Sequence, residues 1–257
     1  QSEVMPLAIA FELIHTATLI HDDVYDESIQ RRNVSTIHSS HGLAPAIIAG
    51  DYLFVEGFGL GGMYDEAIVR IMADCCANIA AGELKQLRHI NDLGTTPDDY
   101  YSIIRGKTAG PFEAGCRGAA IIAGSPEMAD DLARFGAELG LAFQLVDDLL
   151  DIEGDERMGK PRCTDVVEGK MTLPLIHSLT LSHGDSRRRL AEVLIDYEEA
   201  DYDELTLLLN RSDSLHYARI LTNNHLSRAL DILLEFEESA TRDALEFLTR
   251  MVMDRDA

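Results

Sequence analysis

The spacing of apolar residues is the feature that most limits what this chain can fold into. Apolar side chains recur three and four positions apart through most of its 257 residues, and this spacing lines one face of an α-helix. No stretch of six residues alternates polar and apolar side chains as a half-buried strand would. The sequence therefore predicts an all-α fold, with helical segments at 4–21, 45–60, 66–82, 98–123, 127–152 and 226–252.

Glycine and proline divide this helical pattern. Ser125 and Pro126 suit the N-cap and first turn of a helix. Gly110-Pro111 falls inside a helical pattern, so we expect a kink there. The one long irregular stretch is 154–171, with three glycines, a proline and several charges. Loops of that length in compact domains are often functional.

Composition excludes several classes of partner. The chain has 22 Lys and Arg against 45 Asp and Glu, a net charge of −23, which argues against binding to nucleic acid or to an anionic membrane surface. No apolar run is expected to reach the length of a membrane span. There is no internal repeat and no flexible linker, so we expect one domain over 1–257. The four cysteines form no C-x-x-C pair, which predicts free, buried thiols and a cytoplasmic protein.

Two aspartate motifs of the form D-D-x-x-D follow apolar helical runs. They are Asp22-Asp23-Val24-Tyr25-Asp26 and Asp147-Asp148-Leu149-Leu150-Asp151. On a helix the first and fifth positions share a face, so their carboxylates repel unless a cation lies near them. Oxygen ligands suit Mg²⁺, which prefers to share its shell with substrate phosphates. If the two helices face each other, they would clamp Mg²⁺ ions and a diphosphate. The alternative is a pair of solvated acidic faces.

Basic residues lie near both motifs, although the chain as a whole is acidic. Arg31 and Arg32 follow the first motif, Lys107 lies just before the expected kink, and Lys160 and Lys170 belong to the irregular stretch after the second motif. Guanidinium and ammonium groups bind phosphate oxygens. The pattern indicates a site for a diphosphate.

The motifs and their order resemble the trans-prenyl diphosphate synthase family. The region around Leu13–Ser28 with Arg31-Arg32 resembles the first aspartate-rich region of that family. Phe143–Ile152 with Gly159-Lys160-Pro161 and Glu168–Ile176 resembles the second. Three further landmarks lie between them, namely Ala49-Gly-Asp-Tyr-Leu, Gly82-Glu-Leu-Lys-Gln-Leu87 and Lys107-Thr-Ala.

The resemblance implies an all-helical, isoprenoid-synthase-type bundle around a deep central cavity, usually a homodimer. It implies a prenyltransferase of the geranyltranstransferase type, which condenses isopentenyl diphosphate with an allylic diphosphate. Mg²⁺ would be bound by Asp22, Asp26, Asp147 and Asp151. The allylic diphosphate would be held by Arg31, Lys107, Thr108, Gln144, Lys160 and Lys170, and isopentenyl diphosphate would be contacted by His15 and Arg32. Among these, the expected catalytic residues are Asp22, Asp26, Lys107, Asp147 and Lys160.

The resemblance also leads to expectations about the segment before residue 1 and about the length of the product. The family carries a Gly-Gly-Lys-Arg type motif before the first aspartate-rich region, and we expect further helices with that motif to precede residue 1. In the family, bulky residues four or five positions before the first aspartate are thought of as the floor of the cavity in enzymes that make short products. Here these positions hold Ala17 and Thr18, and the next ring is Phe11, so we expect a product of twenty carbons or more. Alternatively, Ala17 and Thr18 pack against a neighbouring helix.

Other classes of function remain as alternatives. Glu12 and His15 offer one Glu-x-x-His motif, but a di-iron bundle needs two such motifs and two further glutamates. A class I terpene cyclase usually has a different second metal motif. A non-catalytic regulatory subunit of a heteromeric synthase tends to lose one aspartate motif, whereas both are complete here.

Overall fold

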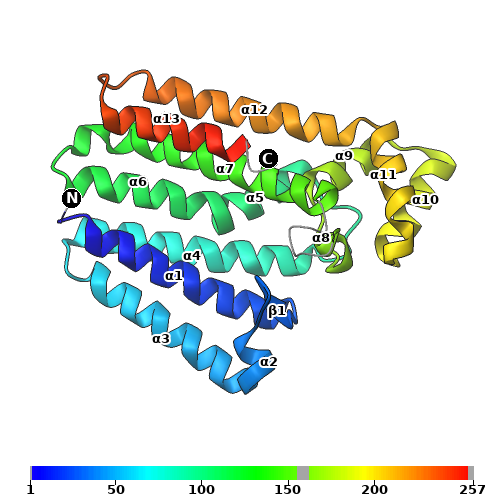
Figure 1. Ribbon diagram of the computed structural model, residues 1–257, viewed down its shortest axis with the longest axis horizontal. Coiled ribbons are helices and arrows are strands. Elements are labelled where there is room, and N and C mark those ends of the chain that lie inside the picture. Colours follow the sequence, from blue (N-terminus) through cyan, green and yellow to red (C-terminus); the bar gives the residue numbers. More distant parts are fainter. Residues whose placement is uncertain (1, 155–161, 254–257) are drawn as a thin grey trace. The chain divides into compact units, whose positions relative to one another are not determined.

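A computed structural model describes residues 2–154 and 162–253. Over these ranges the chain is helical apart from its loops and one short hairpin, which confirms the all-α prediction (Figure 1). The hairpin pairs β1 (Gln30–Arg31) with β2 (Val34–Ser35) in antiparallel register. The helices are α1 Met5–Tyr25, α2 Ile37–His41, α3 Leu43–Gly61, α4 Glu66–Arg88, α5 Pro97–Ile104, α6 Gly110–Ile122, α7 Ala129–Glu153, α8 Thr164–Val167, α9 Leu173–Leu181, α10 Gly184–Ile195, α11 Tyr202–Arg211, α12 Ser214–Leu233 and α13 Ala240–Met253.

Three local features differ from the sequence prediction. The segment 226–252 is not one helix, because α12 ends at Leu233 and α13 begins at Ala240. Apolar residues continue through the break and hide it, while the backbone N–H of Arg242 donates to Ser239 Oγ at the new helix start. The stretch 154–171 contains the short helix α8. Pro126 does begin a helical turn, but Ser125 makes no side-chain capping bond.

The chain divides into two compact units. The first unit comprises residues 1–76 and 114–133, and the second comprises 77–113 and 134–257. The helices α4, α6 and α7 therefore contribute residues to both units. The prediction of a single domain stays a prediction.

In the first unit, α1 packs closely against α3 because glycines allow the approach. A Cβ at Gly57 would lie 3.0 Å from the backbone oxygen of Ala10 and 3.0 Å from the side chain of Ile14. A Cβ at Gly50 would overlap the ring of His21. Leu7, Ala10, Ile14 and Ala17 are buried along α1. The contacts of Ala10, Ile14 and His21 identify the side of α1 that faces α3, whereas Leu7 contacts Gly118 of α6.

The second unit has two buried apolar clusters that fix the C-terminal half of α7. One includes Leu149 and Ile152 of α7 with Leu175 and Leu179 of α9. The other joins Leu141 and Leu145 of α7 to Tyr100 of α5, among others. Because side chains buried this deeply each stabilise a fold by about 1.5–3 kcal/mol, α7 is held firmly where it carries the second aspartate motif.

The expected kink at Gly110-Pro111 takes the form of a π-turn just before it, Arg105–Ala109, between α5 and α6. Proline removes a backbone donor and its ring crowds the preceding turn, and a wider π-turn relieves this crowding. A Cβ at Gly106 would lie 2.6 Å from the backbone oxygen of Asn78 on α4. The absence of a side chain at Gly106 thus lets the π-turn lie against α4.

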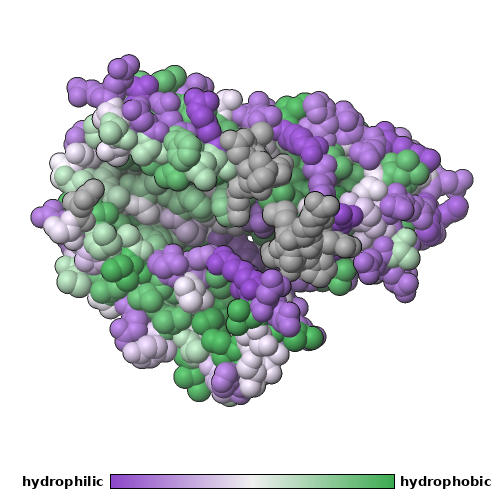
Figure 2. Space-filling model, in the orientation of Figure 1, coloured by the Kyte–Doolittle hydropathy of each residue, from purple (hydrophilic) through white to green (hydrophobic). Residues whose placement is uncertain are grey.

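Helix α3 is apolar but largely exposed. Leu43, Ile48, Tyr52 and Val55 each keep more than half of their surface exposed, and Figure 2 shows apolar side chains over this helix. By length and composition alone α3 could cross a membrane. The sequence prediction overlooked this helix because glycines and two acidic residues divide its apolar residues. Core helices of soluble proteins can have the same length and composition.

Candidate active site

The first aspartate motif forms the last turn of α1. Asp22 and Asp26 are half-buried, whereas Asp23 is only 7% exposed. Asp23 Oδ1 accepts a hydrogen bond of 2.7 Å from Nε of Arg31, and this pair is also an ion pair. The middle aspartate therefore serves as the partner of a cation, and the outer two remain open to solvent.

The hairpin after α1 brings Arg31 back to this helix. Arg32 and Asn33 at its tip both have positive φ, at 51° and 62°, as the tight turns that match strand twist require. The hydroxyl of Thr36 donates to the backbone oxygen of Ser28 at 2.7 Å and closes the loop. The hairpin thus pairs Arg31 with Asp23 and leaves Arg32 exposed.

The remaining candidates of the first unit separate onto different sides of α1. Ala10 and Ile14 contact Gly57 of α3, and Ala17 continues this side and is fully buried. Phe11, His15 and Thr18 lie at the spacing that places them on one side with Asp22. Ala17 is thus buried at the spacing of the side that faces α3, while Thr18 is half-buried. Glu12 and His15 are exposed, which argues against an inward-facing di-iron site.

The second aspartate motif repeats this division. Asp147 is exposed on α7, while Asp148 is 2% exposed. Asp148 Oδ2 accepts a 2.6 Å hydrogen bond from the hydroxyl of Tyr100, and its Oδ1 accepts one of 2.8 Å from Nε2 of Gln144. Burial raises the pKa of Asp148 above its usual range, the charge of Asp165 raises it further, and these two hydrogen bonds oppose the rise.

Gln144 also joins Asp148 to Thr108. The hydroxyl of Thr108 donates to Oε1 of Gln144 at 2.7 Å. Burial and the charge of Asp148 raise the pKa of Tyr100, so its phenol stays protonated and can donate. Four side chains from α5, the π-turn and α7 thus form one hydrogen-bonded chain, Tyr100–Asp148–Gln144–Thr108.

Asp151, the last residue of the second motif, caps α8. Its two carboxylate oxygens accept hydrogen bonds from the backbone N–H groups of Thr164 at 3.0 Å and Asp165 at 3.1 Å. Burial, followed by the charge of Asp165, raises the pKa of Asp151 to about 7. Each carboxylate oxygen keeps a lone pair for a cation. The carboxylates of Asp147, Asp148, Asp151 and Asp165 thus lie close enough to interact, since the charge of Asp165 raises the pKa of both Asp148 and Asp151.

The lysines predicted to bind diphosphate lie in ion pairs. Nζ of Lys107 lies 2.6 Å from Oε2 of Glu83 and 3.1 Å from Oε1 of Gln86, both on α4. Nζ of Lys170 lies 2.5 Å from Oε2 of Glu168. These contacts hold the ammonium groups in defined positions. Lys160 lies outside the described residues.

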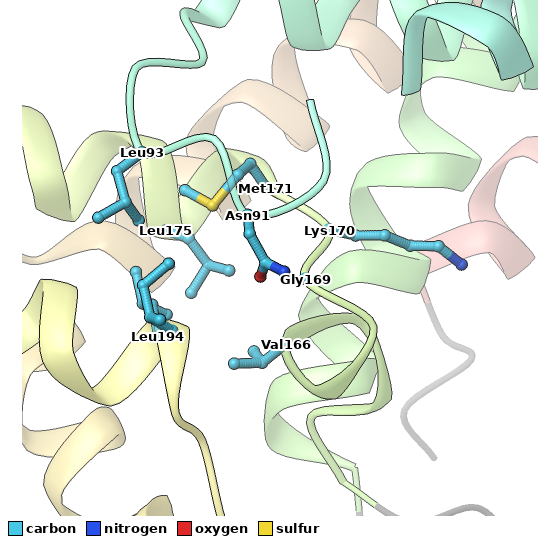
Figure 3. Close-up of a pocket in the computed structure, with 9 residues that line it drawn as sticks. Asn91, Leu93, Val166, Gly169, Lys170, Met171, Leu175 and Leu194 are labelled. Atoms are coloured by element: carbon cyan, nitrogen blue, oxygen red, sulfur yellow. The ribbon is translucent and has the colours of Figure 1, made fainter. Parts of the chain in front are cut away.

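The turn that carries Lys170 rests against the loop after α4. The backbone N–H of Asn91 donates to the carbonyl of Gly169 at 2.8 Å. Gly169 has φ +71°, and a Cβ there would lie 2.3 Å from Oδ1 of Asn91. Figure 3 shows Asn91 beside Gly169 in a narrow apolar gap, with the Lys170 side chain directed away from it. The gap does not admit a water molecule, so it anchors the turn and does not bind a ligand.

The donor set fits Mg²⁺ bound together with a phosphate. Within 2–154 and 162–253, no three His, Cys, Asp or Glu side chains converge into a metal site of their own. Mg²⁺ is usually held by one or two carboxylates plus substrate phosphates and water. Exposed or half-buried carboxylates and the acidic side chains grouped around Asp151 match that requirement. All the candidate ligands are oxygen atoms, which also suits Mg²⁺.

Sequence reasoning missed four residues of this site. Tyr100 lies seven positions before Lys107, and nothing in its helical pattern separates it from a core residue. Glu83 belongs to a family landmark but carried no role, and Glu168 was treated in the same way. Asp165 lies within the irregular stretch, where no periodicity indicated that it would approach Asp151. Contacts between segments far apart in sequence identify Tyr100, Glu83 and Asp165, whereas Glu168 is identified by its contact with nearby Lys170.

Comparisons with known proteins agree with this geometry. The sequence profile of the polyprenyl synthetase family matches residues 1–210. The chain is 37% identical to an all-trans-nonaprenyl-diphosphate synthase (geranyl-diphosphate specific) of Rhodobacter capsulatus, over 97% of this chain and 77% of that protein. Among solved structures, a decaprenyl diphosphate synthase from Rhodobacter capsulatus superposes with a TM-score of 0.91 at 35% identity, covering 98% of this chain and 79% of the other.

A second solved structure, a polyprenyl synthase from Caulobacter crescentus CB15 complexed with calcium and isoprenyl diphosphate, also has a TM-score of 0.91 at 35% identity. It covers 98% of this chain and 78% of its own. The fold is therefore that of the all-helical isoprenoid synthases, as the resemblance implied. On the match over most of its length and on these relatives, the chain belongs to the polyprenyl synthetase family.

Proposed function

We propose that this protein is a trans-prenyl diphosphate synthase, which condenses isopentenyl diphosphate with an allylic diphosphate. The observation that carries the proposal is the presence of two complete aspartate motifs, each with a buried middle aspartate and outer aspartates that are half-buried or exposed. Membership of the polyprenyl synthetase family supports it. The completeness of both motifs favours a catalyst over a regulatory subunit.

Each of the two compact units supplies two of the proposed metal ligands. Asp22 and Asp26 in the first unit, and Asp147 and Asp151 in the second, would hold Mg²⁺ with the substrate diphosphates. The relative solved with calcium and isoprenyl diphosphate supports a divalent metal. The allylic diphosphate would be held by Arg31, Lys107, Thr108, Gln144, Lys160 and Lys170, and isopentenyl diphosphate by His15 and Arg32.

The proposed reaction needs no protein nucleophile. Bound Mg²⁺ would supply positive charge that stabilises the leaving diphosphate. The ammonium groups of Lys107 and Lys170, already fixed by Glu83 and Glu168, would stabilise the charge that develops as the allylic C–O bond breaks. The allylic carbocation then forms a C–C bond with the double bond of isopentenyl diphosphate, and the released diphosphate accepts the proton that is lost.

We infer a long product, because relatives of this chain make nonaprenyl and decaprenyl diphosphates. This replaces the expectation of a geranyltranstransferase-type enzyme. Thr18, and not Ala17, lies on the side of α1 that carries Asp22, so Thr18 is the position to test.

Thr18→Phe should shorten the product, because a ring one helical turn before Asp22 would fill the path of the growing chain; each turn rises about 5.4 Å. Thr18→Val, which keeps the volume, should leave the product length unchanged. Product lengths are read by chromatography of the dephosphorylated prenols. A product from Thr18→Phe as long as that of the wild type would contradict this role.

The chain is also proposed to form a homodimer and to act in the cytoplasm. The exposed apolar residues of α3, including Ile48, Tyr52 and Val55, supply a surface that a second copy would bury. The four free cysteines fit a reducing compartment. Light scattering coupled to gel filtration measures the mass, and a monomer at micromolar concentration would contradict the dimer.

The activity is tested by incubating the protein with labelled isopentenyl diphosphate, an allylic primer and Mg²⁺. We expect a discrete prenyl diphosphate, and we expect none from Asp147→Asn or when EDTA replaces the metal. Failure of the wild type to make a product with dimethylallyl, geranyl or farnesyl diphosphate would overturn the proposed function.

A further inference from the structure

In the second unit, the donors and acceptors around Asp148 fix the orientation of the Gln144 side chain. The Asp148 carboxyl oxygens accept the O–H of Tyr100 at 2.6 Å and an N–H of Gln144 at 2.8 Å. The Gln144 carboxamide is thereby oriented with Nε2 toward Asp148. Its Oε1 accepts from Thr108 at 2.7 Å.

This orientation determines what Gln144 can offer to a ligand. Its oxygen accepts the hydroxyl of Thr108 and one N–H is taken by Asp148, while Nε2 carries a second N–H. Gln144 is half-buried and so remains accessible, whereas Tyr100 and Asp148 are 4% and 2% exposed. The buried pair therefore cannot touch a substrate and acts through Gln144.

We propose that Tyr100 is a positioning residue that fixes Asp148 and, through it, turns the Gln144 carboxamide so that an N–H is presented to the diphosphate of the allylic substrate. The choice of substrate rests on the proposed function, whereas the orientation of Gln144 rests on the hydrogen bonds alone. Without the Tyr100 hydroxyl, Asp148 loses one of its two side-chain donors and is held less firmly, so the Gln144 carboxamide that it orients becomes more mobile.

A structural test does not depend on activity. The chain has only four glutamines, at positions 1, 30, 86 and 144, so selective ¹⁵N-glutamine labelling resolves their side-chain amides, and Gln144→Leu assigns the signal of interest. We expect the Gln144 side-chain amide to exchange with solvent at least tenfold faster in Tyr100→Phe than in the wild type. An unchanged shift and exchange rate would overturn the positioning role.

The matched control is Tyr101→Phe. It removes a hydroxyl from the adjacent position of α5, where Tyr101 contacts Nε2 of His225 at 3.4 Å and takes no part in the chain. This variant should leave the Gln144 signal unchanged. Asp148→Asn, which has nearly the same shape but can donate toward Gln144, should reproduce the effect of Tyr100→Phe.

Kinetics test the link to the substrate. Because a hydrogen bond to a charged group is lost, Tyr100→Phe should raise KM for the allylic diphosphate about tenfold. It should leave KM for isopentenyl diphosphate within twofold, and Tyr101→Phe should leave both unchanged. A wild type without activity would overturn the proposed function while the amide signal still decides the positioning role. An active Tyr100→Phe with both KM values unchanged would overturn the link to the allylic substrate.

Discussion

At the scale of single residues, the two aspartate motifs divide their work in the same way. Asp23 and Asp148 turn inward and accept hydrogen bonds from Arg31 and from Tyr100 with Gln144, while the outer aspartates stay accessible. A buried carboxylate needs such donors because burial without partners is costly. In each D-D-x-x-D motif, the outer carboxylates are thus candidate metal ligands. The middle carboxylate holds a neighbouring group in place, the Arg31 guanidinium in the first motif and the Gln144 carboxamide in the second.

Gly169 offers a residue-scale prediction. Gly169→Ala should destabilise the protein by about 1–2 kcal/mol for the left-handed backbone and by a further amount because the new Cβ would overlap Asn91. Gly124→Ala is the control, since Gly124 also has positive φ but nothing within 4 Å of its Cβ position. Urea unfolding measures both variants, and equal losses would show that the Asn91 contact is unimportant.

At the scale of helices, α5 begins with a complete capping box. Thr96 Oγ1 accepts from the backbone N–H of Asp99, and the Asp99 carboxylate accepts from the backbone N–H and the hydroxyl of Thr96. Lys85 lies 3.0 Å from the same carboxylate. Since α5 carries Tyr100 and leads into the π-turn with Lys107, this cap supports the helix that positions the site.

Thr96→Ala should cost about 1 kcal/mol of stability at pH 7. The hydrogen bonds of Thr96, and then Lys85, lower the pKa of Asp99 below its usual value. The unfolded state therefore binds the proton first, so the contribution of Asp99 is complete above about pH 4 and is lost as the pH falls through the lowered value. The difference between wild type and Thr96→Ala should narrow toward pH 3 in thermal unfolding. A constant difference from pH 7 to pH 3 would argue against coupling between Thr96 and Asp99.

How well the sequence predicts a structural feature of this protein depends on how far apart in the sequence the contacting residues lie. Long helices such as α1, α3 and α7 follow from periodicity, because each needs only one apolar face. The hairpin at Arg31 is too short to show alternation, and the break between α12 and α13 lies within a continuing apolar pattern. The aspartate motifs were evident, but Tyr100 and Asp165 became visible only through contacts that join distant segments.

At the scale of the whole molecule, the net charge of −23 opposes compaction, and part of it gathers around Asp151. Several Mg²⁺ ions bound with one diphosphate would offset that charge, in the folded state only. Any ligand that binds the folded state alone stabilises it, by about 2.7 kcal/mol at a hundred times its dissociation constant. Inorganic diphosphate with Mg²⁺ should therefore raise the Tm by about 5–10 °C in a protein of this size.

Two controls separate specific binding from general screening of charge. NaCl at matched ionic strength screens exposed charges throughout the protein and should raise the Tm of the wild type and of Asp147→Asn by similar amounts. The shift caused by Mg²⁺ with diphosphate should be largely lost in Asp147→Asn, because one candidate metal ligand is then neutral. If this variant kept the full shift, or if NaCl reproduced it in the wild type, the outer aspartate of the second motif would not bind the metal, and the acidic cluster would act only through its overall charge.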